Sequence, residues 1–150
     1  MIRRMRPADA EQAAEIAAGS MPQPWSAQAF REEIKNDAAL LLVSEDERTG
    51  ILQGYISLQL TPDDAELTGI AVRVQLRRGG IAAALLAQAR QLLRAAGCTR
   101  IVLEVRTSNV PAISFYQKHG FTVIGIRGNF YDSPREDALV MQDMKEAFYD

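Results

Sequence analysis

The sequence predicts an α/β (α+β) fold in which a mixed, mostly antiparallel sheet carries helices on its faces. Three strand candidates follow one another with only short turns between them, which is typical of antiparallel hairpins. The glycine pair Gly79-Gly80 then opens the longest amphipathic helix candidate, and another strand and helix follow it. Two further strand candidates end the chain, so both hairpins and helical crossovers are expected within one sheet.

The first part of the chain predicts one short extended segment and two helices. Residues Ile2 to Arg6 are expected to be extended, and Asp9 stands where it can cap an alanine-rich helix. The segment Met21–Trp25 contains two prolines and is therefore not helical. Ser26 then caps a second helix, which presents Phe30 on its apolar face.

The three central strand candidates are Ala39–Ser44, Ile51–Leu60 and Ala65–Arg73. An acidic turn separates the first two, and the turn Pro62-Asp63-Asp64 separates the last two. These short connections predict a three-stranded antiparallel meander.

The second half of the chain predicts two helices and three strands. Gly97 and Gly120 lie where the two helices should end, because glycine readily adopts the left-handed conformation found there. The expected elements are a helix over Ile81–Ala96, a strand over Arg100–Arg106, a short helix capped by Ser108 or Asn109, and strands over Phe121–Ile126 and Ala138–Met144.

Length and composition limit the classes of protein that this chain can represent. Its 150 residues predict a single domain over residues 1–150, and its composition of 47% hydrophobic and 24% charged residues excludes disordered and fibrous classes. A net charge of −2 argues against a nucleic-acid partner, and the lone cysteine and lone histidine predict no metal site. No apolar run reaches the roughly 18 residues of a membrane span, so a cytoplasmic protein without a membrane partner is expected. A monomer or weak dimer is also expected.

The segment around Gly79-Gly80 is a candidate phosphate site. Backbone N–H groups at a helix start have no partner inside the helix, and the helix dipole adds partial positive charge there. Glycine lets an anion approach the backbone closely. An ordinary turn at a helix start explains the same glycines, and neither a P-loop nor a G-x-G-x-x-G fingerprint is present.

Glu104 and Tyr116 are the candidate proton-transfer side chains. Glu104 interrupts an otherwise apolar strand, so its carboxylate either faces a cleft or pairs with a cation such as Arg106. Tyr116 follows core-like residues on a short helix, where a half-buried structural tyrosine is the alternative interpretation.

The order and spacing of these segments resemble the GCN5-related N-acetyltransferase (GNAT) superfamily. The segment Arg77–Ala82 is similar to its acyl-CoA motif, Gln/Arg-x-x-Gly-x-Gly/Ala. Within the superfamily, the chain is most similar to the RimI-type ribosomal-protein alanine N-acetyltransferases. The matching segments cover nearly the whole chain: Pro24-Trp25-Ser26, Gly69–Val72, Leu103–Arg106, Ser108-Asn109, Ala112-Ile113, Phe115-Tyr116, Gly120-Phe121, Asn129–Tyr131 and Arg135–Met141.

The resemblance implies a GNAT fold whose sheet is splayed between its fourth and fifth strands, with acetyl-CoA as cosubstrate in the opening. It implies that Glu104 is the general base and Tyr116 the general acid. Backbone groups of one strand would bind the acetyl-pantetheine arm, and the glycine turn would wrap the pyrophosphate. The cofactor-binding residues implied by position are Ile70, Ala71, Val72, Arg77, Arg78, Gly79, Gly80, Ile81, Ala82, Ala83 and Asn109.

The acceptor implied by the resemblance is the N-terminal α-amine of a protein, in particular the N-terminal alanine of a ribosomal protein. Trp25 and Tyr131 are candidates for the peptide groove, with core or rim packing as the alternative, and Glu66 is a second carboxylate that would help to hold a cationic amine. The chain departs from the family at Arg73-Val74, where an acidic residue and proline are frequent, and at Phe130, where tyrosine is frequent in the subfamily. A lysine side chain or small-molecule amine as acceptor, or an acyl-CoA-binding module without turnover, are the alternatives.

Overall fold

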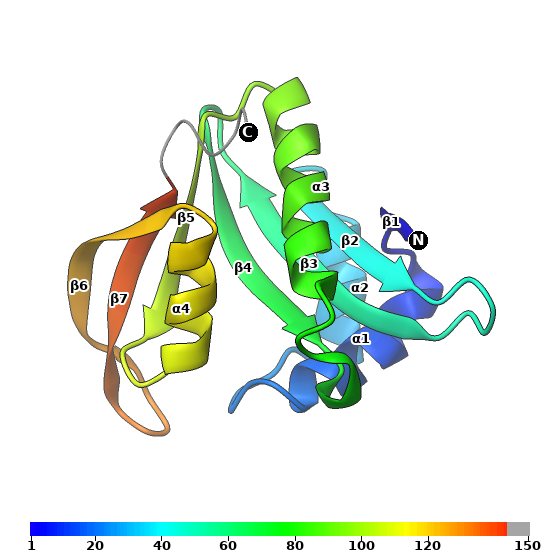
Figure 1. Ribbon diagram of the computed structural model, residues 1–150, viewed down its shortest axis with the longest axis horizontal. Helices are drawn as coiled ribbons and strands as arrows, with labels where there is room; N and C mark the ends of the chain where they lie inside the picture. The colour runs from blue at the N-terminus through cyan, green and yellow to red at the C-terminus, as the bar shows by residue number, and fades with distance from the viewer. Residues whose placement is uncertain (144–150) are drawn as a thin grey trace.

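The computed structural model describes residues 1–143 as a seven-stranded sheet with strand order β1-β2-β3-β4-β5-β7-β6 (Figure 1). Every neighbouring pair is antiparallel except β4 and β5, which run parallel. The strands are β1 (Ile2–Arg4), β2 (Ala39–Glu45), β3 (Leu52–Leu60), β4 (Asp64–Val72), β5 (Arg100–Arg106), β6 (Phe121–Tyr131) and β7 (Glu136–Asp143). The helices are α1 (Ala10–Ala18), α2 (Ala27–Ile34), α3 (Ile81–Ala95) and α4 (Val110–Lys118), with short 3-10 helices at Pro7–Asp9 and Val74–Leu76. The expected fold class is confirmed.

The sheet splits between β4 and β5. These strands pair only from Asp64 opposite Arg100 to Glu66 opposite Val102, although β4 continues to Val72 and β5 to Arg106. Figure 1 shows the two strands diverging from this short contact. They form a V that separates β1–β4 on one side from β5, β7 and β6 on the other. The splay between the fourth and fifth strands is therefore present as expected.

Two hydrophobic cores lie on opposite faces of the sheet. Helices α3 and α4 cover one face, where Leu85, Leu93 and Leu103 belong to the larger core. Helices α1 and α2 cover the other face, where Phe30 and Tyr55 belong to the smaller core. Because successive strand residues alternate between faces, Glu66 and Glu104 lie on the α1–α2 face, opposite their neighbours in the larger core.

Several local signals of the sequence act as expected. The Ser26 side chain accepts a hydrogen bond of 3.1 Å from the Ala29 N–H and so caps α2. Gly80, Gly97 and Gly120 all have positive φ, at the start of α3 and at the ends of α3 and α4. Left-handed backbone at these positions explains why glycine, which has no Cβ, is present there.

Asp9 occupies the position before α1, but its side chain does not cap that helix. Its carboxylate instead accepts a hydrogen bond of 2.7 Å from the Arg6 N–H and forms an ion pair of 2.8 Å with Arg3. The expected cap at Asp9 is wrong, because the buried carboxylate has a charged partner that sequence spacing does not reveal. Strand β1 also ends two residues earlier than expected, at Arg4.

The last hairpin is longer than the sequence predicts. Strand β6 runs to Tyr131 and β7 begins at Glu136, where a polar loop was expected. The polar stretch is an exposed edge strand with an irregular register between Arg127 and Tyr131, and Asn129 there has a φ of 52°. Exposure on both sides removes the apolar alternation by which such a strand is recognised. The expected final residue of the last strand, Met144, lies outside the described residues.

Gly54 on β3 allows the end of β4 to lie close by. A Cβ at residue 54 would stand 2.7 Å from the Ala71 carbonyl oxygen, a backbone atom that cannot move independently. We expect Gly54→Ala to lower the free energy of unfolding by about 1–3 kcal/mol, the usual cost of overpacking, in urea denaturation. Gly125→Ala on β6 is the matched control, because a Cβ there meets nothing within 4 Å. Equal stability of the two variants would contradict the close approach.

Candidate active site

The turn between β4 and α3 presents an uncapped helix N-terminus. Gly80 is the N-cap residue with a φ of 83°, and no side chain caps the helix. The first N–H groups of α3, from Ile81 onward, have no acceptor within the helix. Residues 77–80 are exposed, and Arg78 also has a positive φ of 69°. In this conformation, an anion could reach the backbone N–H groups and the positive end of the helix dipole directly.

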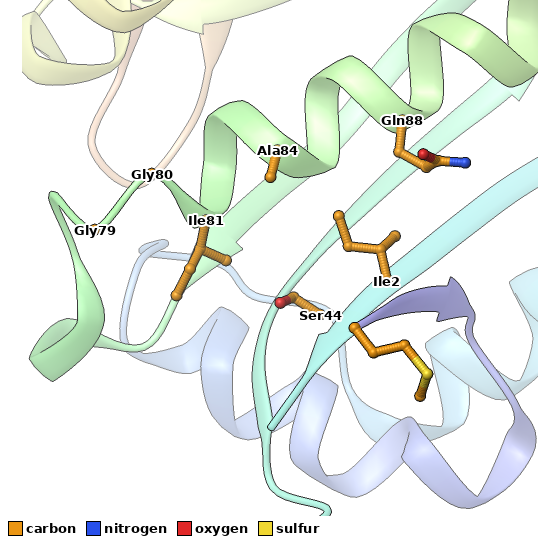
Figure 2. Close-up of a pocket in the computed structure, with 8 residues that line it drawn as sticks. Ile2, Ser44, Gly79, Gly80, Ile81, Ala84 and Gln88 are labelled. Atoms are coloured by element: carbon orange, nitrogen blue, oxygen red, sulfur yellow. The ribbon is translucent and has the colours of Figure 1, made fainter. Parts of the chain in front are cut away.

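A cavity of about 540 Å³ adjoins the same turn on the side of α3 that faces β1 and β2. Figure 2 shows Ile2 and Ser44 opposite the first turns of α3, with Gly79 and Gly80 at one end. The V lies on the opposite side of α3, toward β5 (Figure 1). The glycine turn is therefore accessible from the cavity as well as from the V.

Two arginines fix the conformation of this turn from its N-terminal side. Arg77 donates through its guanidinium to the Gly19 carbonyl at 3.1 Å and to Ser20 Oγ at 2.9 Å. Arg73 donates to the Leu52 carbonyl at 2.6 Å and pairs with Glu15 of α1. The turn is thus attached to α1 and β3. These contacts account for arginine at residue 73, where the family frequently has an acidic residue.

A pair of carboxyl groups stands at the base of the V. The carboxyl groups of Glu66 on β4 and Glu104 on β5 lie within hydrogen-bonding reach of each other, although 37 residues separate them in the sequence. Partial burial and the nearby charge and hydrogen bond of Glu104 raise the pKa of Glu66, and Arg127 opposes this. The Arg127 Nε atom lies 3.7 Å from a Glu104 oxygen. Glu66 therefore loses its proton at a higher pH than an isolated glutamate does.

The cation beside Glu104 is Arg127 of β6 and not Arg106, which lies on β5 with Glu104. Arg106 pairs instead with Glu136 at 3.3 Å, and Glu136 also accepts a hydrogen bond of 2.6 Å from the Ser108 N–H. The hydrogen bond from the Ser108 side chain, with others from the same turn, lowers the pKa of Glu136 to about 2. This carboxylate thus holds the turn between β5 and α4. Of the arginines that could pair with Glu104, the structure brings Arg127 to it and not Arg106.

Two tyrosines are linked electrostatically to this site. Tyr116 on α4 is 8% exposed, and burial followed by the proximity of Tyr131 raises the pKa of its hydroxyl. Burial and the charge of Glu104 raise the pKa of Tyr131, and Arg106 opposes them from 4.3 Å above its ring. Tyr131 therefore lies within electrostatic range of both Tyr116 and Glu104.

The sequence also matches known proteins. The profile of the acetyltransferase (GNAT) family matches residues 10–121. The chain belongs to the GNAT family. It is an acetyl-CoA-dependent N-acetyltransferase with the sheet, helices and V of that fold.

Relatives of this GNAT enzyme act on a ribosomal protein according to their names. The Escherichia coli K12 ribosomal protein bS18-alanine N-acetyltransferase is 34% identical over 120 residues, 79% of each chain. A Bacillus subtilis protein is 38% identical over 141 residues, which are 93% of this chain and 92% of the Bacillus chain. Its name assigns it the same activity provisionally. The crystal structure of the Escherichia coli ribosomal-protein-S18-alanine N-acetyltransferase superposes with a TM-score of 0.85 at 30% identity, covering 95% of this chain and 91% of the other.

Two residues expected to contact substrates have structural partners in this GNAT enzyme. The Asn109 side chain accepts a hydrogen bond of 3.3 Å from the Ala112 N–H and so caps α4. Trp25 packs edge-to-face on Phe30, with ring centroids 5.3 Å apart, at the border of the smaller core. Tyr131, in contrast, lies within electrostatic range of Glu104. These positions favour Tyr131 over Trp25 for contact with an acceptor.

No helix among residues 1–143 is long and apolar enough to cross a membrane. In the same range, no group of three or more His, Cys, Asp or Glu side chains could hold a metal ion.

One residue of this site was missed by sequence analysis. Arg127 lies in a polar stretch without apolar alternation, and nothing in the sequence pairs it with Glu104. Only the register between strands could have identified this residue.

Proposed function

We propose that this enzyme transfers the acetyl group of acetyl-CoA to the N-terminal α-amine of a protein, with the N-terminal alanine of a ribosomal protein as the acceptor. The observation that carries the proposal is the pairing of Glu66 and Glu104 at the base of the V, together with the electrostatic link of this site to Tyr116 and Tyr131. The names of the Escherichia coli and Bacillus subtilis relatives support the ribosomal acceptor.

The proposed cofactor site uses the free edge of β4 and the glycine turn. Beyond Glu66, β4 pairs with β3 but no longer with β5, so the backbone groups of Ile70 and Val72 would face the V, whereas the carbonyl of Ala71 between them points toward β3. An extended arm that carries amide groups fits such an edge as an added strand. The N–H groups of residues 78–83 would hold the pyrophosphate. The guanidinium of Arg77 already has partners, so we assign it to shaping the turn.

The proposed chemistry needs one proton acceptor and one proton donor. Glu104 would accept the proton of the amine, directly or through a water molecule, and Tyr116 would give a proton to the departing thiolate. A backbone N–H of Val72 would stabilise charge on the acetyl oxygen. Because an α-amine has a pKa of about 7.7–8.0 and lysine about 10.4, freeing lysine at neutral pH costs roughly 3.5 kcal/mol more. One carboxylate base is thus better suited to an α-amine.

Glu66 is assigned to holding the cationic form of the acceptor. We expect Glu66→Gln to raise KM for the acceptor peptide about fivefold, the effect of losing one partly exposed charge contact of about 1 kcal/mol. We also expect the acid limb of the kcat/KM profile to move to lower pH. In the native pair, burial and Glu104 raise the pKa of Glu66, so a proton is retained to higher pH. Unchanged KM and an unchanged acid limb would contradict this assignment.

A peptide assay tests the proposed acceptor. The enzyme is incubated with acetyl-CoA and peptides that begin with Ala, Ser or Met, and with a lysine-containing peptide whose N-terminus is blocked, and release of free thiol is followed. We expect the fastest turnover on the peptide that begins with the ribosomal alanine sequence. Turnover on the blocked lysine peptide alone would replace the proposed acceptor by a lysine side chain. Faster turnover on a small-molecule amine would replace it by that class.

A further inference from the structure

Tyr55 is a buried tyrosine whose hydroxyl has no role in the machinery described above. It lies on β3 in the smaller core, is 2% exposed, and packs edge-to-face on Phe30 with ring centroids 5.1 Å apart. Among residues 1–143, no hydrogen-bond partner is found for its hydroxyl. The oxygen of this hydroxyl is not among the fully buried side-chain atoms that lack a partner, so it keeps contact with solvent and is free to donate to a molecule bound there.

The Tyr55 side chain extends from β3 over β4, where its hydroxyl lies against Gly69. A Cβ on Gly69 would stand 3.3 Å from the Tyr55 hydroxyl oxygen and 3.2 Å from Ser57 Oγ, so a side chain at residue 69 would displace them. Gly69 directly precedes the segment Ile70–Val72, the free edge of β4. A bulge at Thr68 brings Gly69 opposite Ser57. The phenol hydroxyl therefore lies at the beginning of the segment of β4 that is not paired with β5.

The place of the Tyr55 hydroxyl along β4 favours the acetyl end of the proposed site. The hydroxyl lies at Gly69, past Glu66 and directly before Ile70–Val72, the segment proposed to hold the acetyl-pantetheine arm. Burial and the proximity of Tyr116 raise the pKa of Tyr55. A phenol that remains protonated at working pH is a hydrogen-bond donor and not a base.

We propose that Tyr55 is a further active-site residue, whose hydroxyl donates a hydrogen bond to the carbonyl oxygen of the acetyl group. This inference rests on the proposed placement of acetyl-CoA in the V. The hydroxyl would act together with a β4 backbone N–H, since a carbonyl oxygen accepts two hydrogen bonds and stabilisation grows as negative charge develops on it. Gly69 is required in this arrangement because any side chain there would separate the phenol from the edge of β4.

The test compares binding of acetyl-CoA with binding of CoA by calorimetry in the native enzyme and in Tyr55→Phe. We expect the Kd of acetyl-CoA to rise about fivefold to tenfold in the variant, the effect of one lost hydrogen bond, with the Kd of CoA unchanged. Because the lost hydroxyl has no protein partner, the urea midpoint should not fall, while kcat should fall about tenfold. Ser57→Ala is the matched control: its hydroxyl lies beside the same glycine but is bonded to Thr68 at 2.8 Å, and it should change neither Kd.

The outcomes separate this inference from the proposed function. Equal changes in both Kd values, or no change in either, would overturn the role of Tyr55 and leave the cofactor site intact. A lower urea midpoint with unchanged discrimination would assign the hydroxyl to structure alone and would also overturn it. Failure of the native enzyme to bind either compound would overturn the proposed cofactor site and this inference with it.

Discussion

Glu104→Gln is expected to lower kcat/KM for the acceptor peptide by about 10²- to 10⁴-fold at pH 7, the usual contribution of a general base. Glutamine keeps the shape of the side chain and its contact with Glu66 but cannot accept a proton from the amine. Because Glu104 is on a strand with both neighbours in the larger core, its backbone position should be unaffected. Steady-state kinetics with a peptide that begins with alanine measures the loss.

The pH dependence of the loss identifies its cause. The fraction of free α-amine rises steeply through pH 7.7–8.0, so a variant without the base should recover part of its rate by pH 9. The affinity for acetyl-CoA should be unchanged, since Glu104 is assigned to the amine. Glu66→Gln, which removes the neighbouring carboxylate, is the matched comparison and should lose far less in kcat. A deficit equal at pH 6 and pH 9 would contradict proton removal as the role of Glu104.

Local signals in the sequence predicted much of the architecture because each depends on residues that are near in the chain. Short acidic and proline-containing turns predicted the β2–β3–β4 meander, and glycines at the boundaries of α3 and α4 predicted where those helices begin or end. The cap of α2 by Ser26 depends on a residue only three positions away. Such signals need no knowledge of tertiary packing.

The candidate site depends on contacts that local signals do not contain. Glu66 and Glu104 meet because β4 and β5 pair in parallel over three positions, and α3 intervenes between these strands in the sequence. A one-residue change of that register would turn one carboxylate to the opposite face. Arg127 is likewise brought to Glu104 by the pairing of β6, β7 and β5. Sequence analysis named both Glu104 and Glu66, but neither their contact with each other nor the approach of Arg127.

The two arginines before α3 illustrate a second limit of sequence reasoning. Arg77 belongs to the acyl-CoA motif and was expected among the cofactor-binding residues, yet its guanidinium donates to Gly19 and Ser20. Arg73 replaces a frequently acidic residue and pairs with α1 through Glu15. Both side chains attach the glycine turn to the α1–α2 side of the molecule. A motif therefore identifies the turn, whereas the role of each side chain in it follows from tertiary contacts.

Tyr116→Phe is expected to lower kcat by about 10²-fold while the Kd of acetyl-CoA stays the same. A hydroxyl that acts only as the thiolate departs contributes to the transition state and not to binding, so the loss should appear in kcat. Phenylalanine fits the packing of Tyr116 against Phe121, whose ring centroid lies 5.5 Å away, so folding should be retained. Burial raises the pKa of Tyr116, which keeps the proton available on the phenol until negative charge develops on sulfur.

The leaving group provides the decisive control for this assignment. A thiol with a pKa near 8.5 benefits from a proton donor, whereas an acetyl thioester of a more acidic thiol departs without one. The deficit of Tyr116→Phe should therefore shrink with such a donor, while that of Glu104→Gln should not. Tyr131→Phe should instead raise KM for the acceptor more than it lowers kcat, because Tyr131 is placed at the acceptor end. A deficit in Tyr116→Phe that is independent of the leaving group would exclude Tyr116 as the acid and leave solvent as the proton source.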